Sequence, residues 1–140
     1  MKKLFSFAFV LLTLGTGCFA QKNVKAPAPV MSSFSKDFPG ATTKWEKEGA
    51  NYEANFKQSG KSMSALYDAK GNRQETEQSI KVAELPQSVK DYIAKNYKGE
   101  KIKEAAIITK ANGEVNYEAE VKGMDVLFSK DGKFIKTAKD

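Results

Sequence analysis

The sequence contains no histidine, and its single cysteine is Cys18. Histidine is the side chain most used for proton transfer near neutral pH and the commonest zinc ligand, so its absence argues against both kinds of site. Without a cysteine beyond residue 18, the rest of the chain has no thiol nucleophile, no disulfide and no sulfur-ligated metal. We therefore predict no catalytic residue, no metal site and no cofactor.

Long blocks of one charge are also missing, although the formal net charge is +6. Lysines alternate with aspartates and glutamates along the chain, a pattern that is typical of a solvated surface. A nucleic-acid-binding protein would instead gather its basic residues on one face. We therefore expect no nucleic-acid partner.

The one long apolar run, over residues 4–14, follows two lysines and precedes small residues up to Ala20. This is the layout of a secretory signal, and the run is shorter than the ~20 apolar residues that span a bilayer. We predict a signal peptide over residues 1–20, cleaved after Ala20, which leaves a periplasmic or secreted protein without a membrane span. A lipid anchor on Cys18 is the alternative, although a lipoprotein signal usually has leucine where Gly15 stands.

Two stretches of the chain share a pattern of apolar residues ending in glycine. The first stretch contains Val30, Phe34, Phe38 and Gly40. The second contains the matching residues Val89, Ile93, Tyr97 and Gly99. The spacing i, i+4, i+8 places three apolar residues along one stripe of a helix, and the glycine fits the left-handed position just past its end. Asn51-Tyr52-Glu53-Ala54 likewise recurs as Asn116-Tyr117-Glu118-Ala119. We predict a flexible lead-in over residues 21–29 and two tandem repeats, 30–82 and 83–140.

Alternation of apolar and polar residues predicts four strands after each helix. They cover residues 42–48, 52–57, 62–68 and 73–77 in the first repeat, and 101–110, 115–122, 125–129 and 133–137 in the second. Asn112-Gly113 and Asp131-Gly132 are strong hairpin signals. The predicted fold class is α+β, with two tandem helix–β-meander repeats that form an antiparallel sheet of about eight strands. Two helices cover one face of this sheet, and the opposite face stays open.

With its helices and strands in this order, the chain resembles the PepSY-like proteins. These are related by fold to the β-lactamase-inhibitor protein and are also called BLIP-like. The matching stretches are Phe38-Pro39-Gly40-Ala41, Lys44-Trp45-Glu46-Lys47, Tyr52-Glu53-Ala54-Asn55-Phe56, Leu85-Pro86 with Val89, Ile93 and Tyr97, and Asp131-Gly132-Lys133. The resemblance covers residues from about 30 to the end and implies a secreted or periplasmic binding module. Inhibitor-type relatives grip a partner protein with the exposed concave face of the sheet, and the resemblance implies that this face is the binding face.

Aromatic side chains on an open sheet face are the candidate binding anchors. Trp45 is the first candidate, since its alternation partners Thr43 and Lys47 place it on a mainly polar face. The alternative is that Trp45 packs against a helix or the neighbouring repeat. Tyr67 and Phe128 are further candidates, whose matched positions suit core packing equally well.

Pairs of glutamates at i and i+2 also share a face of their strands, namely Glu46 with Glu48 and Glu118 with Glu120. Acid–base catalysis would require a pocket that shifts one pKa. Because lysines flank these pairs in the sequence, we interpret them as part of a solvated face.

These observations favour a non-catalytic exported binding module that presents an open sheet face to a protein or peptide of the cell envelope. Two alternatives remain. One is an inhibitor or regulator of an envelope hydrolase. The other is a small-molecule or envelope-sensing module, which would need an apolar pocket between the helices and the sheet.

Overall fold

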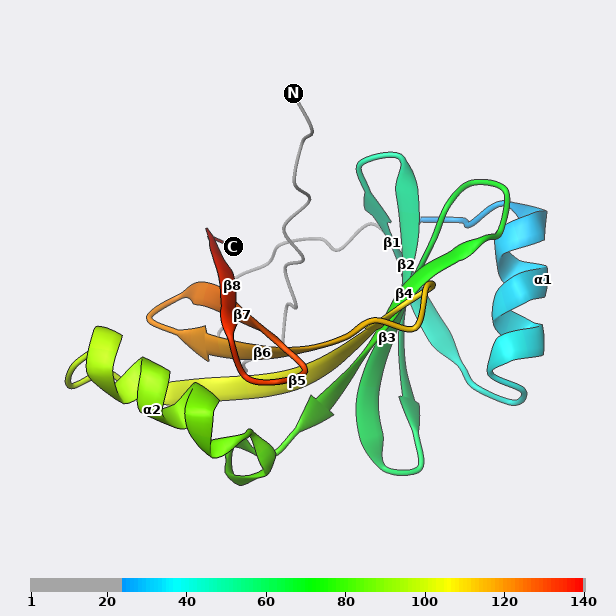
Figure 1. Cartoon of the computed structure of the whole chain (residues 1–140). Helices are drawn as coiled ribbons and strands as arrows, with labels where there is room; N and C mark the ends of the chain where they lie inside the picture. Colours follow the sequence, from blue (N-terminus) through cyan, green and yellow to red (C-terminus); the bar gives the residue numbers. More distant parts are fainter. Residues whose placement is uncertain (1–23, 140) are drawn as a thin grey trace, which may run out of the picture.

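The computed structural model describes residues 24–139. The predicted signal peptide, its cleavage after Ala20 and a lipid anchor on Cys18 therefore lie outside the described residues. The elements run in the order α1 (Ala28–Asp37), β1 (Thr43–Glu48), β2 (Asn51–Gln58), β3 (Lys61–Tyr67), β4 (Arg73–Ile80), the 3-10 turn η1 (Val82–Glu84), α2 (Gln87–Asn96), β5 (Ile102–Lys110), β6 (Val115–Val121), β7 (Met124–Ser129) and β8 (Phe134–Lys139). In the described part of the chain a helix followed by four strands thus occurs twice (Figure 1).

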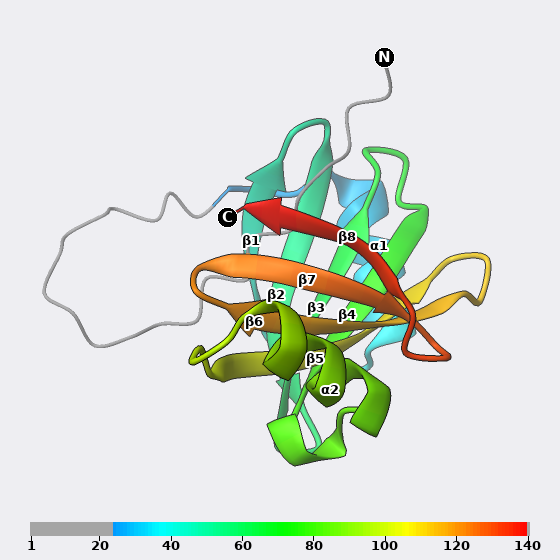
Figure 2. The same cartoon turned by 60° about the vertical axis from the view of Figure 1, so that its left-hand side comes forward.

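The eight strands form one antiparallel sheet in which every strand pairs with its neighbour in the sequence. The two halves of the chain join edge to edge through β4 and β5, from the pair Glu75 and Lys110 to the pair Ile80 and Ala105. Figures 1 and 2 show that the sheet is strongly twisted, so that β1 to β4 run across the direction of β5 to β8. The predicted α+β class with two helices and an eight-stranded antiparallel sheet is confirmed.

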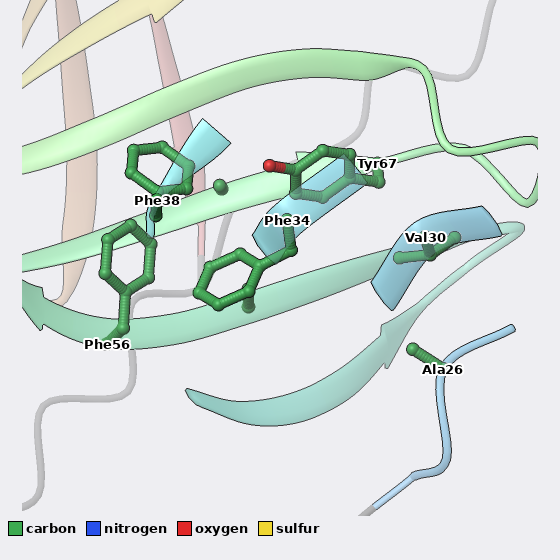
Figure 3. Packing of buried hydrophobic residues seen from close by; sticks show 8 residues of the cluster. Ala26, Val30, Phe34, Phe38, Phe56 and Tyr67 are labelled. Carbon is green, nitrogen blue, oxygen red and sulfur yellow. The ribbon is translucent and has the colours of Figure 1, made fainter. Parts of the chain in front are cut away.

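Helix α1 forms because its apolar residues recur every four positions and its first turn carries proline, whose missing N–H is not needed there. It buries Val30 and Phe34 against the sheet (Figure 3). Helix α2 repeats this arrangement with Val89 and Ile93. After α1, Gly40 has a left-handed φ of 79° but lies two residues beyond the C-cap Phe38, one position later than the spacing predicts.

Each helix packs on its own hydrophobic cluster. The first cluster holds Ala26, Val30, Phe34, Phe38, Ala54, Phe56, Ala65 and Tyr67. The second holds Leu85, Val89, Ile93, Ala105, Ala119, Val121, Val126 and Phe128. The strand register places both clusters on one face, because Ala65 pairs with Thr76 and Ala105 pairs with Ile80, four residues further along β4. Both helices therefore cover one face, and we call the other the helix-free face.

The end of the predicted flexible lead-in is part of the packed structure. The Val24 N–H donates a hydrogen bond of 3.3 Å to the Trp45 carbonyl, and Ala26 is only 2% exposed. Residues 24–27 therefore pack beside β1, with Ala26 as a member of the first cluster.

Candidate functional site

Two of the three predicted binding anchors are fully buried beneath the helices. Tyr67 and Phe128 are both 0% exposed and belong to the first and second clusters respectively. The ring of Phe128 lies 5.3 Å from that of Tyr92 on α2, and the Tyr67 hydroxyl donates a hydrogen bond of 2.9 Å to Asp37. Neither side chain reaches the helix-free face, which corrects the prediction that they contact a partner there.

Trp45 also lies on the helix-covered face. It pairs with Ala54, and its ring lies 5.4 Å from that of Phe34 in an edge-to-face arrangement. Trp45 is partly buried against the first cluster. Of the two placements that the sequence left open, the structure therefore gives packing against a helix, and the polar neighbours Thr43 and Lys47 were a misleading guide to the face.

The helix-free face is lined instead with carboxylates. The register and the alternation of each strand place nine of the 17 acidic residues on it: Glu46, Glu48, Glu53, Glu75, Glu77, Glu104, Glu118, Glu120 and Asp125. Four lysines share this face by register, namely Lys44, Lys57, Lys110 and Lys136, and Lys103 at the bulge of β5 reaches it with its Nζ atom 3.9 Å from Oε1 of Glu120. Charges that alternate in the sequence are therefore sorted by the sheet, and this face is acidic although the chain is basic.

The centre of this face is buried and hollowed. Glu53, Glu77, Glu118 and Asp125 are buried, as are their uncharged neighbours Ser64 and Asn116. A cavity of about 200 Å³ opens beside them, with Glu75, Ile108, Glu118, Asp125, Leu127 and Lys136 in its lining. A smaller hollow shares Glu118 and Asp125 and adds Glu77, Glu104 and Glu120. The carboxylates therefore form the floor of a recess.

Burial alters the acidity of Glu53. Removal of its carboxyl from water raises its pKa to about 7, while a hydrogen bond from the Ser64 hydroxyl opposes this shift. The charges of Glu48, Glu46 and Glu75 raise the pKa further. A carboxyl group with such a pKa exchanges its proton near neutral pH.

Glu77 is the most deeply placed of these groups, with 3% of its surface exposed. Burial raises its pKa to about 8, and the charges of Glu53, Asp125, Glu75 and Glu104 add to the shift. Among the described residues, its Oε2 atom has no hydrogen-bond partner. A buried polar atom without a partner destabilises the fold unless a ligand or water satisfies it.

The interpretation of the glutamate pairs as a solvated face is corrected by their burial. Glu118 is 6% exposed, and Glu46, Glu48 and Glu120 are half-buried. Lysines that are adjacent in sequence do not screen them, because a neighbour in a strand points to the other face. Lys47, for example, lies 3.8 Å from the centre of the Tyr52 ring on the helix-covered face.

The sequence analysis missed Glu53, Glu75, Glu77 and Asp125 as members of this site. The available signal was the recurrence of acidic residues at i and i+2, which includes Glu75 with Glu77. The sequence pattern does not show that these residues are buried, because burial depends on how the whole sheet folds.

Within residues 24–139, no group of three or more potential ligands is arranged to hold a metal ion. The same part of the chain contains no helix of the length and apolar character that crossing a membrane requires.

A family model described as "Putative beta-lactamase-inhibitor-like, PepSY-like" matches residues 50–136, which is more than half of the chain. The chain belongs to the PepSY-like family. The match covers β2 through β7 and the first half of β8, and therefore most of the helix-free face. No protein of curated function matches this PepSY-like chain.

Solved structures share the fold. A protein from Bacteroides uniformis ATCC 8492 is 20% identical with a TM-score of 0.72, over 81% of this chain and 88% of that one. A "putative periplasmic" protein from Bacteroides eggerthii DSM 20697 is 17% identical with the same score and coverage. A BLIP-like protein from Bacteroides fragilis NCTC 9343 is 23% identical with a TM-score of 0.63, over 81% of this chain and 86% of that one. These similarities establish the fold of this PepSY-like chain.

Proposed function

We propose that this chain is a non-catalytic binding module of the bacterial cell envelope, which holds a protein or peptide partner against its helix-free face. The observation that carries the proposal is the acidic recess in the centre of that face, where buried carboxyl groups lack the cover that the helices give to the other face. Ionisable groups in a recess are more often part of a binding site than of a simple surface.

Binding without chemistry fits the residues available. The sequence has no histidine, and the Ser64 hydroxyl that hydrogen-bonds the Glu53 carboxyl is itself buried, with 1% of its surface exposed. The signal-like segment before residue 21 and the described location of the Bacteroides eggerthii structure support a periplasmic or secreted location. The lipid anchor on Cys18 stays the alternative form of attachment.

A narrower version of the proposal is that the partner is an envelope hydrolase and that binding regulates it. The description of the family as beta-lactamase-inhibitor-like favours this version. A small-molecule sensor is less well supported, because the two hydrophobic clusters fill the space between helices and sheet and the cavity lies on the opposite face.

Site-specific photocrosslinking of the exported full chain in its native host tests the proposal. A crosslinking amino acid would replace Lys57 or Lys136 on the helix-free face, and Ala94 or Lys98 on the helix-covered side. All four side chains lie at the surface or partly so, which limits the structural cost. We expect a discrete protein adduct from the first two positions alone. Adducts of equal yield from both sides, or none from the helix-free face, would refute the proposal.

A further inference from the structure

The cavity on the helix-free face has two chemically different zones. Its walls are apolar where Ile108, Leu127 and Ile135 line it. Its floor is acidic, because Glu118 and Asp125 line both this cavity and the smaller hollow that contains Glu77. The volume of about 200 Å³ is room for several water molecules, and therefore for one long side chain.

One buried acceptor atom at the floor has no hydrogen-bond donor within residues 24–139. Glu77 is 97% buried, lines the smaller hollow, and has no partner for its Oε2 atom among the described residues. A ligand that brings an N–H group to this hollow removes the penalty of that buried atom. This observation is independent of the number of acidic residues around it.

The charges of the lining exclude an anionic ligand. The two hollows together contain seven acidic residues, of which Glu77, Glu118 and Asp125 are buried, against Lys110 and Lys136. Lys110 is already engaged by Glu114, with 3.1 Å between Nζ and Oε1. Both lysines act on Glu75, which lines the outer cavity only. Within the described residues the lining of the smaller hollow contains no basic side chain, although Nζ of Lys103 lies 3.9 Å from Oε1 of Glu120 at its border, and the excess of carboxyl groups there favours a cation.

A lysine or arginine side chain has both properties that these two zones require. Its methylene stem packs on apolar surface while its charged head makes hydrogen bonds to carboxylates. An arginine suits the floor best, because its planar fork carries five donors that several carboxyl groups can share. A purely apolar side chain would leave Oε2 of Glu77 without a donor.

We propose that the partner is held through one of its lysine or arginine side chains, which enters this cavity with its stem against Ile108 and Leu127 and its head at Glu118 and Asp125, the two residues that border the smaller hollow of Glu77. This inference rests on the proposed function and names the chemistry of the partner at the contact. Since a cation favours the ionised form of nearby carboxyl groups, binding releases protons at neutral pH.

Methyl NMR of the full mature chain tests this proposal with a defined probe. The probe is an acetylated and amidated peptide, Ala-Ala-Arg-Ala-Ala, and its control has citrulline in place of arginine, which keeps the shape but removes the charge. We expect saturable shifts of the Ile108 and Leu127 methyl signals with the arginine peptide at millimolar concentration. The citrulline peptide should bind about tenfold more weakly, the loss of one charged hydrogen bond. Equal binding of both peptides, or no shift of these two signals, would overturn the proposal.

Matched variants locate the binding. Glu118→Gln and Glu77→Gln each remove one carboxyl group from the floor with little change of shape, and each should weaken the arginine peptide about tenfold. Asp91→Asn makes the same change on the exposed side of α2, where Asp91 accepts a hydrogen bond from Gln87, and should leave binding unchanged. Thermal melting of each variant shows that it folds. Equal effects of Glu118→Gln and Asp91→Asn would place the peptide elsewhere and overturn the proposal.

The outcomes separate this inference from the proposed function. If photocrosslinking gives protein adducts from the helix-free face but NMR shows no preference for the arginine peptide, the cationic contact is refuted and the proposed function stands. Selective arginine binding together with no adduct from that face would refute the protein partner, and would leave a pocket for free cationic ligands.

Binding of the arginine peptide is expected to weaken as salt is added, because the contact is electrostatic. Salt-independent binding would contradict it.

Discussion

The hydroxyl group of Tyr67 on β3 donates a hydrogen bond of 2.9 Å to Oδ2 of Asp37, the last residue of α1. The same carboxylate oxygen lies 3.3 Å from Nη1 of Arg73, at the start of β4. A side chain that sequence alone offered as a partner-binding anchor therefore joins the helix to the sheet. Its role is to fix α1 in place on the helix-covered face.

Tyr67→Phe keeps the ring and removes this hydrogen bond. We expect a loss of about 1 kcal/mol of unfolding free energy, because Asp37 keeps its ion pair with Arg73. Denaturant unfolding measures this loss. Binding of the arginine peptide should not change, since Tyr67 lies on the face opposite the cavity, and a weaker affinity would count against that separation.

Trp45→Ala should lower stability rather than binding. The indole packs edge-to-face on Phe34 at 5.4 Å and lies 6.2 Å from the ring of Tyr67, so its removal leaves a gap in the first cluster. We expect a loss of about 3 kcal/mol, the lower end of the range for buried tryptophan, because Trp45 is only partly buried. A variant with wild-type melting temperature and weakened partner adducts would show that Trp45 is an anchor after all.

Stability should fall as the pH rises from about 5 to 8. The pKa of Glu77 is raised to about 8 and that of Glu53 to about 7, above the value of 4.5 for an unperturbed glutamate. In this interval the folded chain binds more protons than the unfolded chain, so the unfolding free energy decreases with pH, by at most about 1.4 kcal/mol per pH unit for each such group. Below pH 4.5 both states are protonated and this dependence disappears.

Glu77→Gln separates this effect from other titrations. The amide cannot ionise, so we expect a shallower decrease between pH 5 and pH 8 and a variant that is more stable than the wild type above pH 8. Melting temperatures over this pH range measure both. Parallel curves for the two proteins would contradict the assignment of the titration to Glu77.

The turn between β3 and β4 requires glycine at position 71 for two reasons. Gly71 has a φ of +86°, and a Cβ atom there would lie 2.7 Å from the carbonyl oxygen of Pro29 at the start of α1. Gly113 has a similar φ of +84° with nothing near a Cβ atom, so Gly113→Ala measures the cost of the left-handed backbone alone. We expect about 1–2 kcal/mol for Gly113→Ala and a clearly larger loss for Gly71→Ala in denaturant unfolding. Equal losses would mean that α1 moves away at no cost.

The strands were largely predictable because each one alternates. Seven of the eight predicted strands lie within two residues of the observed bounds at each end, whereas β4 continues to Ile80, three residues beyond the prediction. The segment after Glu77 is polar and carries little alternation of its own. It stays extended because β4 is paired on both sides, with β3 and with β5. Backbone hydrogen bonds to β3 and β5 therefore hold this segment extended although its sequence does not alternate.

The site was not predictable from single strands. Alternation shows which residues share a face but not which face the helices cover, and Trp45 shows the ambiguity, since its two alternation partners are polar. Glu77 on β4 and Asp125 on β7 line the same hollow, where the charge of Asp125 acts on Glu77. That proximity joins residues far apart in the chain, and no period in the sequence encodes it. The two tandem repeats stay a prediction, which the repeated order of elements supports.

The most direct test of the acidic helix-free face is a charge reversal compared with a matched control. Glu118→Lys places a cation on the floor of the cavity, and Asp91→Lys makes the same change of charge on the exposed side of α2. Both variants would be produced in the native host with the crosslinking amino acid at Lys57, after melting curves have shown that they fold. We predict that Asp91→Lys keeps the adduct of the wild type and that Glu118→Lys loses it. An undiminished adduct from a folded Glu118→Lys protein would contradict the account.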